Sequence, residues 1–166
     1  GGGAYASGGH LTITNASHIV NCTASASGSG YALGGGARVD GVGYLIITDA
    51  SGIVNCTAST SGSGGAAGGG AFAEGGHLTI TDASGIIDCT ASSTSGVALG
   101  GGAYAYRGDI SITDASHIID CTASGSGGAY GGGAYGLVGD ISITGASHII
   151  DCTASGSGGA YGGGAY

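Results

Sequence analysis

The side chains of this chain that could do chemistry recur at fixed places in a repeat, and cysteine is the most regular of them. The thiols fall at Cys22, Cys56, Cys89, Cys121 and Cys152. Regular thiols suggest a metal site or disulfides, but no Cys-x-x-Cys pair exists, and stacked repeats would place the sulfur atoms in a straight ladder. Side chains of in-register strands also point the same way, which disfavours disulfides. We therefore expect free, buried thiols that pack as small hydrophobic groups, with partial oxidation or metal binding as the alternative.

Two further columns are acidic or amide. One precedes cysteine and comprises Asn21, Asn55, Asp88, Asp120 and Asp151. The other comprises Asn15, Asp49, Asp82, Asp114 and Gly145. Carboxylates about 5 Å apart repel by roughly 1 kcal/mol even in water, so such columns must be solvated, protonated or bridged by a cation. Because the Asp-x-Asp-x-Asp-Gly pattern of a calcium loop is absent, we expect solvated turn residues, with calcium binding as the alternative.

The histidines also share columns. His10 aligns with His77, and His18 aligns with His117 and His148. The last two occupy adjacent repeats and could share a metal ion or a proton. A surface histidine beside a corner is the commoner case, so we assign no metal-ligating histidine.

All three asparagines lie in N-glycosylation sequons. These are Asn15-Ala16-Ser17, Asn21-Cys22-Thr23 and Asn55-Cys56-Thr57. The Ala-Ser and Cys-Thr pairs occur in every repeat, including those with aspartate, so the coincidence partly reflects the repeat itself. Asn15, which stands at a predicted corner, is the expected acceptor if the chain is secreted.

Composition narrows the classes of function. The net charge is −8, and Arg38 and Arg107 are the only strong cations, so the chain lacks the basic surface that nucleic acid or an anionic membrane would require. No apolar run approaches the roughly 20 residues of a membrane span. Solenoid polysaccharide lyases need a basic residue beside clustered carboxylates, whereas the two arginines fall in different repeats. We expect no enzyme, with no catalytic, cofactor-binding or metal-binding residue.

These columns imply elements that recur with the same period. The triplet Gly-Gly-Gly opens at positions 1, 34, 68, 100, 131 and 162, and a period of this size indicates a solenoid. Segments 109–135 and 140–166 differ only where Asp114 becomes Gly145. We predict one solenoid domain over residues 1–166, or a segment of a longer solenoid, with repeats that start near 1, 34, 68, 100 and 131 and a partial repeat at 162.

The sequence within each repeat predicts short β-strands. Large apolar residues alternate with Thr or Ser, the period of a strand with one buried face. The inward columns are Leu11, Leu45, Leu78, Ile110, Ile141 and Ile13, Ile47, Ile80, Ile112, Ile143. After an Asx-Ala-Ser corner, a second strand is predicted at 118–123 and a third at 133–135, where Gly and Ala permit close backbone approach. We predict an all-β, right-handed parallel β-helix of about five coils of 31–34 residues, with three short strands per coil.

Two short motifs carry a family resemblance. The pairing of Gly128-Ala129-Tyr130 with Ile118-Ile119-Asp120-Cys121-Thr122-Ala123 resembles the GGAI and FxxN repeats of polymorphic outer-membrane and autotransporter-type proteins. The resemblance implies a right-handed parallel β-helix displayed on a cell surface. Cysteine stands here where that family has asparagine, and tyrosine mostly replaces the isoleucine of GGAI, so neither the anchoring mode nor a bacterial origin is carried over.

Repetition without a unique constellation favours a structural role. We expect an extracellular or cell-surface solenoid that forms or contributes to a filament, stalk or fibre shaft, associating with itself end to end or laterally, with glycans or calcium as further candidate partners. Because the chain begins and ends within a coil without a polar terminal unit, we expect that more coils continue or that copies stack. Two aromatic columns are expected to stack along the rod, with lateral adhesion as the alternative: Tyr5, Phe72, Tyr104, Tyr135, Tyr166 and Tyr130, Tyr161.

The alternative function is ice binding or surface adhesion through outward Thr and Ser columns. Thr12-x-Thr14 and Thr79-x-Thr81 resemble the Thr-x-Thr rows of ice-binding solenoids. The second column is complete, as Thr14, Thr48, Thr81, Thr113 and Thr144, whereas the first is interrupted by Ile46, Ser111 and Ser142. Outward threonine is also what any solvated strand prefers, so we place this alternative below the structural role.

Overall fold

The computed structural model describes residues 1–166, and every regular element in it is a β-strand. Five parallel sheets of five strands each run along the stack, and each strand pairs with its equivalents in the coils before and after. The pairing is in register, since Leu78 lies beside Leu45 on one side and Ile110 on the other. The chain is therefore a parallel β-solenoid of five coils, as the sequence predicted. No helix is present that could cross a bilayer.

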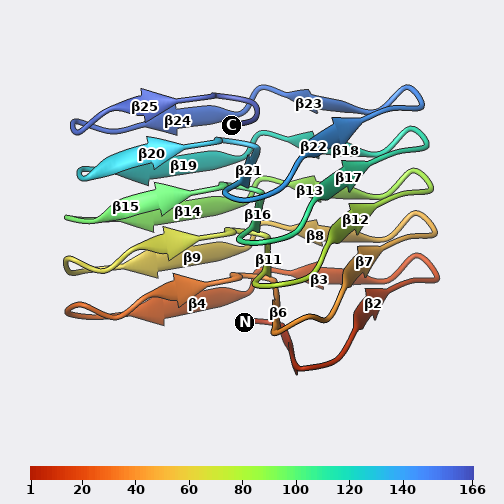
Figure 1. The fold of residues 1–166 in the computed structure, drawn as a ribbon, viewed down its shortest axis with the longest axis horizontal. Helices are drawn as coiled ribbons and strands as arrows, with labels where there is room; N and C mark the ends of the chain where they lie inside the picture. The colour runs from red at the N-terminus through yellow and green to blue at the C-terminus, as the bar shows by residue number, and fades with distance from the viewer.

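Three sheets enclose the larger part of each coil, which we call the Ile lobe. Sheet A consists of β1 (Ala4–Ser7), β6 (Ala37–Asp40), β11 (Ala71–Ala73), β16 (Ala103–Ala105) and β21 (Ala134–Gly136). Sheet B consists of β2 (Leu11–Ile13), β7 (Leu45–Ile47), β12 (Leu78–Ile80), β17 (Ile110–Ile112) and β22 (Ile141–Ile143). Sheet C consists of β3 (His18–Val20), β8 (Gly52–Val54), β13 (Gly85–Ile87), β18 (His117–Ile119) and β23 (His148–Ile150). In Figure 1, sheets B and C form the right side of the stack and sheet A lies near its centre.

The other two sheets face each other across a narrower layer, which we call the Ala lobe. Sheet D consists of β4 (Thr23–Ala26), β9 (Thr57–Thr60), β14 (Thr90–Ser93), β19 (Thr122–Gly125) and β24 (Thr153–Ser155). Sheet E consists of β5 (Ala32–Leu33), β10 (Ala66–Ala67), β15 (Val97–Leu99), β20 (Gly128–Tyr130) and β25 (Ala160–Tyr161). The Ala lobe forms the left side of the stack in Figure 1.

The coil is built from five kinds of strand, one from each sheet, and not from the three that the sequence predicted. Segment 118–123, expected as one strand, is divided into β18 and β19 because Asp120 between them has a φ of 54°. A residue in this left-handed conformation turns the chain and interrupts the strand. The strand predicted at 133–135 is found as β21, but β20 precedes it on the other side of Gly131, whose φ is 57°. Corner residues therefore divide each coil more finely than hydrophobic alternation indicates.

The two lobes have different cores. In the Ile lobe the predicted inward columns are confirmed: Leu45, Ile47 and their equivalents in the middle coils are fully buried, packed against Ile53, Ile86 and Ile118 of sheet C. In the Ala lobe the buried core consists of Ala32, Ala58, Ala66, Ala91, Ala98, Ala123 and Ala129. Methyl groups alone allow sheets D and E to approach closely, because the space between packed sheets is set by the side chains that fill it.

The glycine triplets cross between the lobes, where no side chain fits. A Cβ atom on Gly102 would lie 2.7 Å from Cγ2 of Ile118 and 3.1 Å from Sγ of Cys121. Gly100, the first residue of the same triplet, has a φ of 56°, which favours glycine. The triplets that mark the repeat in the sequence are thus required by close approach and by backbone conformation.

Candidate functional site

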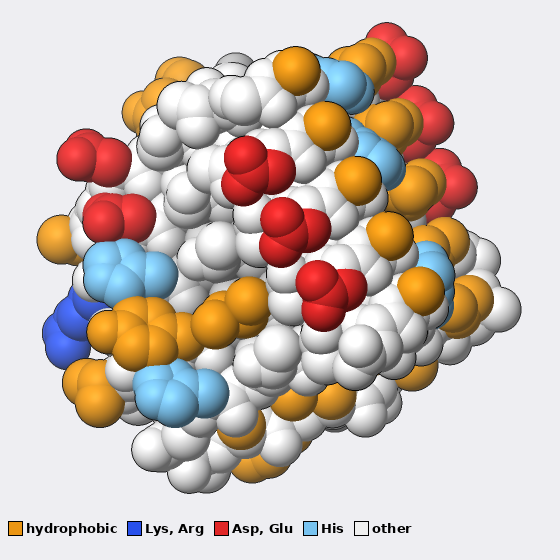
Figure 2. Space-filling view, turned by 90° about the vertical axis from the view of Figure 1, so that its right-hand side faces the viewer, with side chains coloured by type: hydrophobic (Ala, Val, Ile, Leu, Met, Phe, Trp, Pro, Cys, Tyr) orange, Lys and Arg blue, Asp and Glu red, His pale blue; other side chains and the backbone are white.

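The residues singled out by the sequence lie in rows along the solenoid. Figure 2 shows acidic and histidine side chains aligned across successive coils. No group of three or more His, Cys, Asp and Glu side chains lies close enough together to hold a metal ion. Each row is therefore described through its contacts with the coils before and after it.

The five cysteines form the predicted ladder inside the Ile lobe, and all are free thiols. Cys56, Cys89 and Cys121 are fully buried. Sγ of Cys89 accepts the backbone N–H of Cys56 at 3.4 Å, and its S–H donates to the carbonyl oxygen of Ile87 at 3.3 Å. The same two contacts recur at Cys56 and Cys121. Cysteine therefore links coils through hydrogen bonds as well as packing as a small hydrophobic group, and the sequence analysis did not predict the first role.

Neighbouring thiols of the ladder shift one another's pKa values. Contacts with the neighbouring thiols, together with burial, raise the pKa of Cys56 and Cys121. Hydrogen bonds from the thiols of Cys121 and Cys56 lower the pKa of Cys89, although burial opposes that shift. No charged side chain is buried in the core to stabilise a thiolate. The contacts between neighbouring thiols therefore shift the cysteine pKa values in opposite directions along the ladder.

A ladder of serines at the Asx-Ala-Ser corner also links coils through hydrogen bonds. The sequence analysis did not single it out. Ser51, Ser84 and Ser116 are buried, and Oγ of Ser84 accepts the backbone N–H of Ser51 at 3.1 Å. Equivalent bonds join Ser17 to Ser51, Ser84 to Ser116 and Ser116 to Ser147. The signal that could have revealed this ladder is the Ala-Ser pair that every repeat carries.

The Asx-Ala corner itself is a tight turn. Asp114 and Ala115 have φ values of 56° and 59°, and the backbone N–H of Ser116 donates to the carbonyl oxygen of Thr113 at 3.2 Å. Two successive residues at positive φ inside such a bond define a type I′ turn. Asx residues and glycine tolerate this conformation, which explains why Gly145 replaces aspartate in the last coil.

The carboxylates of this column hydrogen-bond to threonine. Thr48 donates to Asp82 at 2.7 Å, Thr81 donates to Asp114 at 2.9 Å, and Thr14 donates to Asp49. In each pair the threonine belongs to the coil before the aspartate. All members of both acidic columns are exposed and have positive φ, as expected of residues in turns. The threonines of the complete column are thereby partly engaged.

The column that contains His10 and His77 includes an aromatic ring. Tyr44 lies between them, with ring centroids 4.9 and 5.5 Å away. Nδ1 of His10 accepts the backbone N–H of Tyr44, and Nδ1 of His77 accepts that of Asp109. Nδ1 of His77 also lies 3.3 Å from the carboxylate of Asp109. These histidines therefore serve as acceptors for the next coil.

The other histidine column is discontinuous. His117 and His148 stack with their ring centroids 6.1 Å apart. His18 is separated from them by Gly52 and Gly85, which occupy the same register in the intervening coils. The structure thus brings two of the three aligned histidines together.

The three asparagines of the sequons are exposed. Asn15 lies at a corner with a φ of 58°, as expected. Asn21 and Asn55 pair with each other, since Nδ2 of Asn55 donates to Oδ1 of Asn21 at 2.7 Å. Asn15 therefore remains the predicted acceptor.

One aromatic column stacks on sheet A, and the other, Tyr130 and Tyr161, stacks on the neighbouring sheet E with ring centroids 5.1 Å apart. Tyr104 and Tyr135 have ring centroids 5.3 Å apart, and burial raises the pKa of Tyr104. Arg38 interrupts the predicted alignment of Tyr5 with Phe72 and lies over both rings, 5.5 and 5.7 Å from their centroids. Stacking along the rod, the expected arrangement, is therefore confirmed, with a cation inserted in the second coil.

Arg38 also binds Asp40. Its Nε and Nη2 donate to the carboxylate at 2.6 and 2.7 Å, and the hydroxyl of Tyr5 donates to the same group at 2.8 Å. Burial alone would raise the pKa of Asp40, but these hydrogen bonds outweigh it and hold the pKa below its ordinary value. The cluster ties coil one to coil two.

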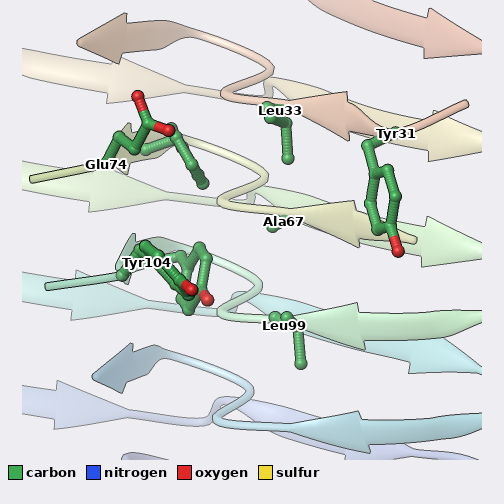
Figure 3. A pocket seen from close by; sticks show the side chains of 8 residues that line it. Tyr31, Leu33, Ala67, Glu74, Leu99 and Tyr104 are labelled. Carbon is green, nitrogen blue, oxygen red and sulfur yellow. The ribbon is translucent and has the colours of Figure 1, made fainter. Parts of the chain in front are cut away.

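A groove lies where sheets A and E meet. It encloses about 250 Å³ and is lined by Tyr31, Leu33, Ala67, Phe72, Glu74, Leu99, Tyr104 and Tyr106. Figure 3 shows Leu33, Leu99 and Tyr31 on one side and Glu74 and Tyr104 on the other. The lining differs from coil to coil, unlike the ladders.

Sheet D carries a face of hydroxyl groups that the sequence analysis did not single out. Every cysteine is followed by Thr-Ala-Ser, and the strand directs alanine inward and the other two side chains outward. The outward residues are Thr23, Thr57, Thr90, Thr122, Thr153 and Ser25, Ser59, Ser92, Ser124, Ser155. The side-chain hydrogen bonds around sheet D are made by Thr60, Ser93 and Thr94, and these outward hydroxyls, which are partly or fully exposed, take part in none of them. The invariant Cys-Thr-Ala-Ser was the available signal.

Comparison of the chain with family models, with curated proteins and with solved structures gave no match. Function is therefore inferred from the side-chain rows themselves. The rows that looked best suited to chemistry, the cysteines and the acidic corners, make contacts between coils.

Proposed function

We propose that this chain is a structural β-solenoid that forms, or contributes to, the shaft of a filament, stalk or fibre. The observation that carries the proposal is that the polar columns at the corners join one coil to the next. Serine Oγ and cysteine Sγ atoms accept backbone N–H groups from the preceding coil throughout the stack. A catalytic site, or a site for one small ligand, needs one place that differs from the others, and these columns repeat.

The serine and cysteine ladders supply hydrogen-bond acceptors at the corners, where the backbone does not. At a corner the strands end, so an N–H group there would be buried without a partner, at a cost of about 1–3 kcal/mol. Serine and cysteine provide that partner at each corner without adding bulk. Because each coil contacts only its neighbours, cohesion is distributed evenly along the axis, as a load-carrying rod requires.

Extension along the axis would use the same ladders. In the last coil Ile143 is 40% exposed, whereas its equivalents Ile80 and Ile112 are fully buried. A further coil, from the same polypeptide or from a second copy, would cover this apolar surface and pair the strand edge. These features support end-to-end association.

We place the protein outside the cell or on its surface. The exposed sequon at Asn15 and the resemblance of the Gly-Gly-Ala-Tyr segments to repeats displayed on cell surfaces support this location. Immunogold labelling of intact, unpermeabilised cells of the source organism tests it. Labelling that requires permeabilisation would place the protein elsewhere.

Electron microscopy of the purified chain tests the filament. Continuous filaments with a meridional repeat near 4.8 Å are expected, the spacing between paired strands. Discrete rods at micromolar concentration, or aggregates without that repeat, would contradict end-to-end assembly.

A pair of variants in the last coil makes this test specific. Ile143→Lys places a charge on the exposed end of the core and is expected to leave short, folded rods. Ser142→Lys, on the outward side of the same strand, is the matched control and should still assemble. Equal assembly by both variants would show that the end coils do not form the contact.

A further inference from the structure

We propose that sheet D is an ice-binding surface, formed by the outward threonine and serine hydroxyls of β4, β9, β14, β19 and β24. This inference goes beyond a structural role and does not rest on it, because a single rod carries the whole face. Its occupant is crystalline water, an uncharged solid whose surface repeats in two dimensions. Four features of sheet D fit that occupant.

The hydroxyls of sheet D are available. Those of Thr48 and Thr81, in the column that the sequence favoured, donate to aspartates of the next coil. Thr90, Ser92 and their equivalents take part in none of the side-chain hydrogen bonds of sheet D, which are made by the inward Thr60 and Ser93 and by Thr94 in the following loop. Their hydrogen-bonding capacity is left for water.

The outward residues of sheet D are the same in every coil, whereas those of sheets B and C vary. The outward position at the centre of sheet B changes along the stack through Thr12, Ile46, Thr79, Ser111 and Ser142. On sheet C, a single register position holds His18, Gly52, Gly85, His117 and His148. Solvation alone accepts any polar residue. Two identical outward residues in every coil of sheet D therefore call for a partner that is itself periodic.

The spacing of sheet D produces a lattice. Equivalent hydroxyls on paired strands lie about 4.8 Å apart, and alternate residues of one strand lie about 6.7 Å apart. Oxygen atoms on the faces of ice repeat on a comparable scale. Water molecules held by the hydroxyls, with threonine methyl groups between them, can therefore take positions that continue into the crystal.

The face is uncharged and unobstructed. The chain carries a net charge of −8, yet no strand of sheet D contains a charged residue. The loops that follow these strands begin with small Ser, Thr and Gly residues, so no bulky side chain follows them directly. Behind the face, the inward position between each outward threonine and serine is alanine in every coil, which keeps these two hydroxyls level, whereas the next inward position varies.

The test is thermal hysteresis, the gap between the melting and freezing temperatures of a single ice crystal, measured with the full chain. The wild type is expected to show hysteresis and to shape the crystal into facets. Thr90→Lys, in the middle coil of sheet D, is expected to lose most of it. Thr79→Lys is the matched control, because Thr79 is an outward threonine of the same coil on sheet B, and this variant should keep it.

Ser124→Lys, on the next strand of sheet D, is a second variant of the same face, for use if Thr90→Lys does not fold. Circular dichroism and melting temperature establish that each variant is folded. A folded wild type without hysteresis would overturn the proposal, and so would equal loss in Thr79→Lys and Thr90→Lys. Binding to crystalline cellulose that Thr90→Lys abolishes, without any effect on ice, would assign the face to a crystalline polysaccharide instead.

Discussion

In the Ile lobe, sheets A, B and C surround columns of leucine, isoleucine and cysteine, whereas in the Ala lobe sheets D and E meet through alanine methyl groups. Burial of an isoleucine side chain contributes about 1.5–3 kcal/mol, and a single methyl group about 0.8 kcal/mol. The Ile lobe therefore supplies most of the hydrophobic stabilisation of each coil. The Ala lobe depends on strand pairing and close approach.

The two lobes of each coil therefore differ in the side chains that they tolerate. A thick core tolerates gradual change, since one of its columns passes from leucine to isoleucine and glycine or histidine occupies its outer positions. In the thin lobe, Ala58, Ala91 and Ala123 keep one inward position of sheet D constant, while the next inward position holds the buried, hydrogen-bonded Thr60 and Ser93. The invariant hydroxyl face lies over the thin lobe, where uniform spacing is easiest to maintain.

The largest loss of stability is expected from truncating a core side chain of the Ile lobe. Ile80 is fully buried in the middle coil. Ile80→Ala should lower the free energy of unfolding by about 4 kcal/mol, through lost burial and the cavity that remains. Urea unfolding followed by circular dichroism measures this. Ile46→Ala, on the outward side of the neighbouring strand, is the control, and a similar loss in both would contradict the proposed core.

A small-to-large substitution is expected to destabilise the Ala lobe. Ala91 is fully buried between sheets D and E. Ala91→Leu should cost about 2 kcal/mol, because the added carbons force the sheets apart. Ser92→Val, the outward neighbour, should change stability by less than about 0.5 kcal/mol. If Ala91→Leu is as stable as the wild type in the same urea assay, the alanine layer is not closely packed.

A substitution in the turn at the tip of the Ile lobe is expected to increase stability slightly. Ala83 has a φ of 56°, which is unfavourable for a residue with a Cβ atom. Ala83→Gly should raise the free energy of unfolding by about 0.5 kcal/mol, the relief of strain exceeding the added entropy of the unfolded chain. Ala91→Gly, within a strand of the Ala lobe, should instead destabilise. Thermal melts of the two variants should therefore shift in opposite directions.

The smallest effect concerns pH and the Arg38–Asp40 pair on sheet A. The pKa of Asp40 is lower in the folded chain than in the unfolded one, so the unfolded state binds the proton more tightly. The pair's contribution is therefore present above the ordinary pKa of about 3.9 and is lost as the pH falls through the folded value. NMR titration of the Asp40 carboxyl measures the shift. Arg38→Ala should raise that pKa, and an unchanged value would assign the shift to another cause.

Much of the architecture could be predicted because the repeat is short and nearly exact. The glycine triplets gave the coil length, and alternation in segments such as Leu78–Ile80 identified the inward columns. The burial of Cys89 followed from its neighbours in the same way. The number of strands was wrong, because the corner at Asp120 depends on a positive φ that an aspartate permits without requiring.

The sequence by itself determined the period, the inward columns and the stacking of equivalent residues, because these depend on local alternation and on identity between repeats. Only the tertiary structure decided which polar groups are engaged. Thr81 is occupied because Asp114, from the next coil, lies within hydrogen-bonding distance, and Thr90 is free because no such residue stands beside it. Partners so far apart in sequence meet only when the coils stack, so the free hydroxyl face of sheet D is a property of the stack.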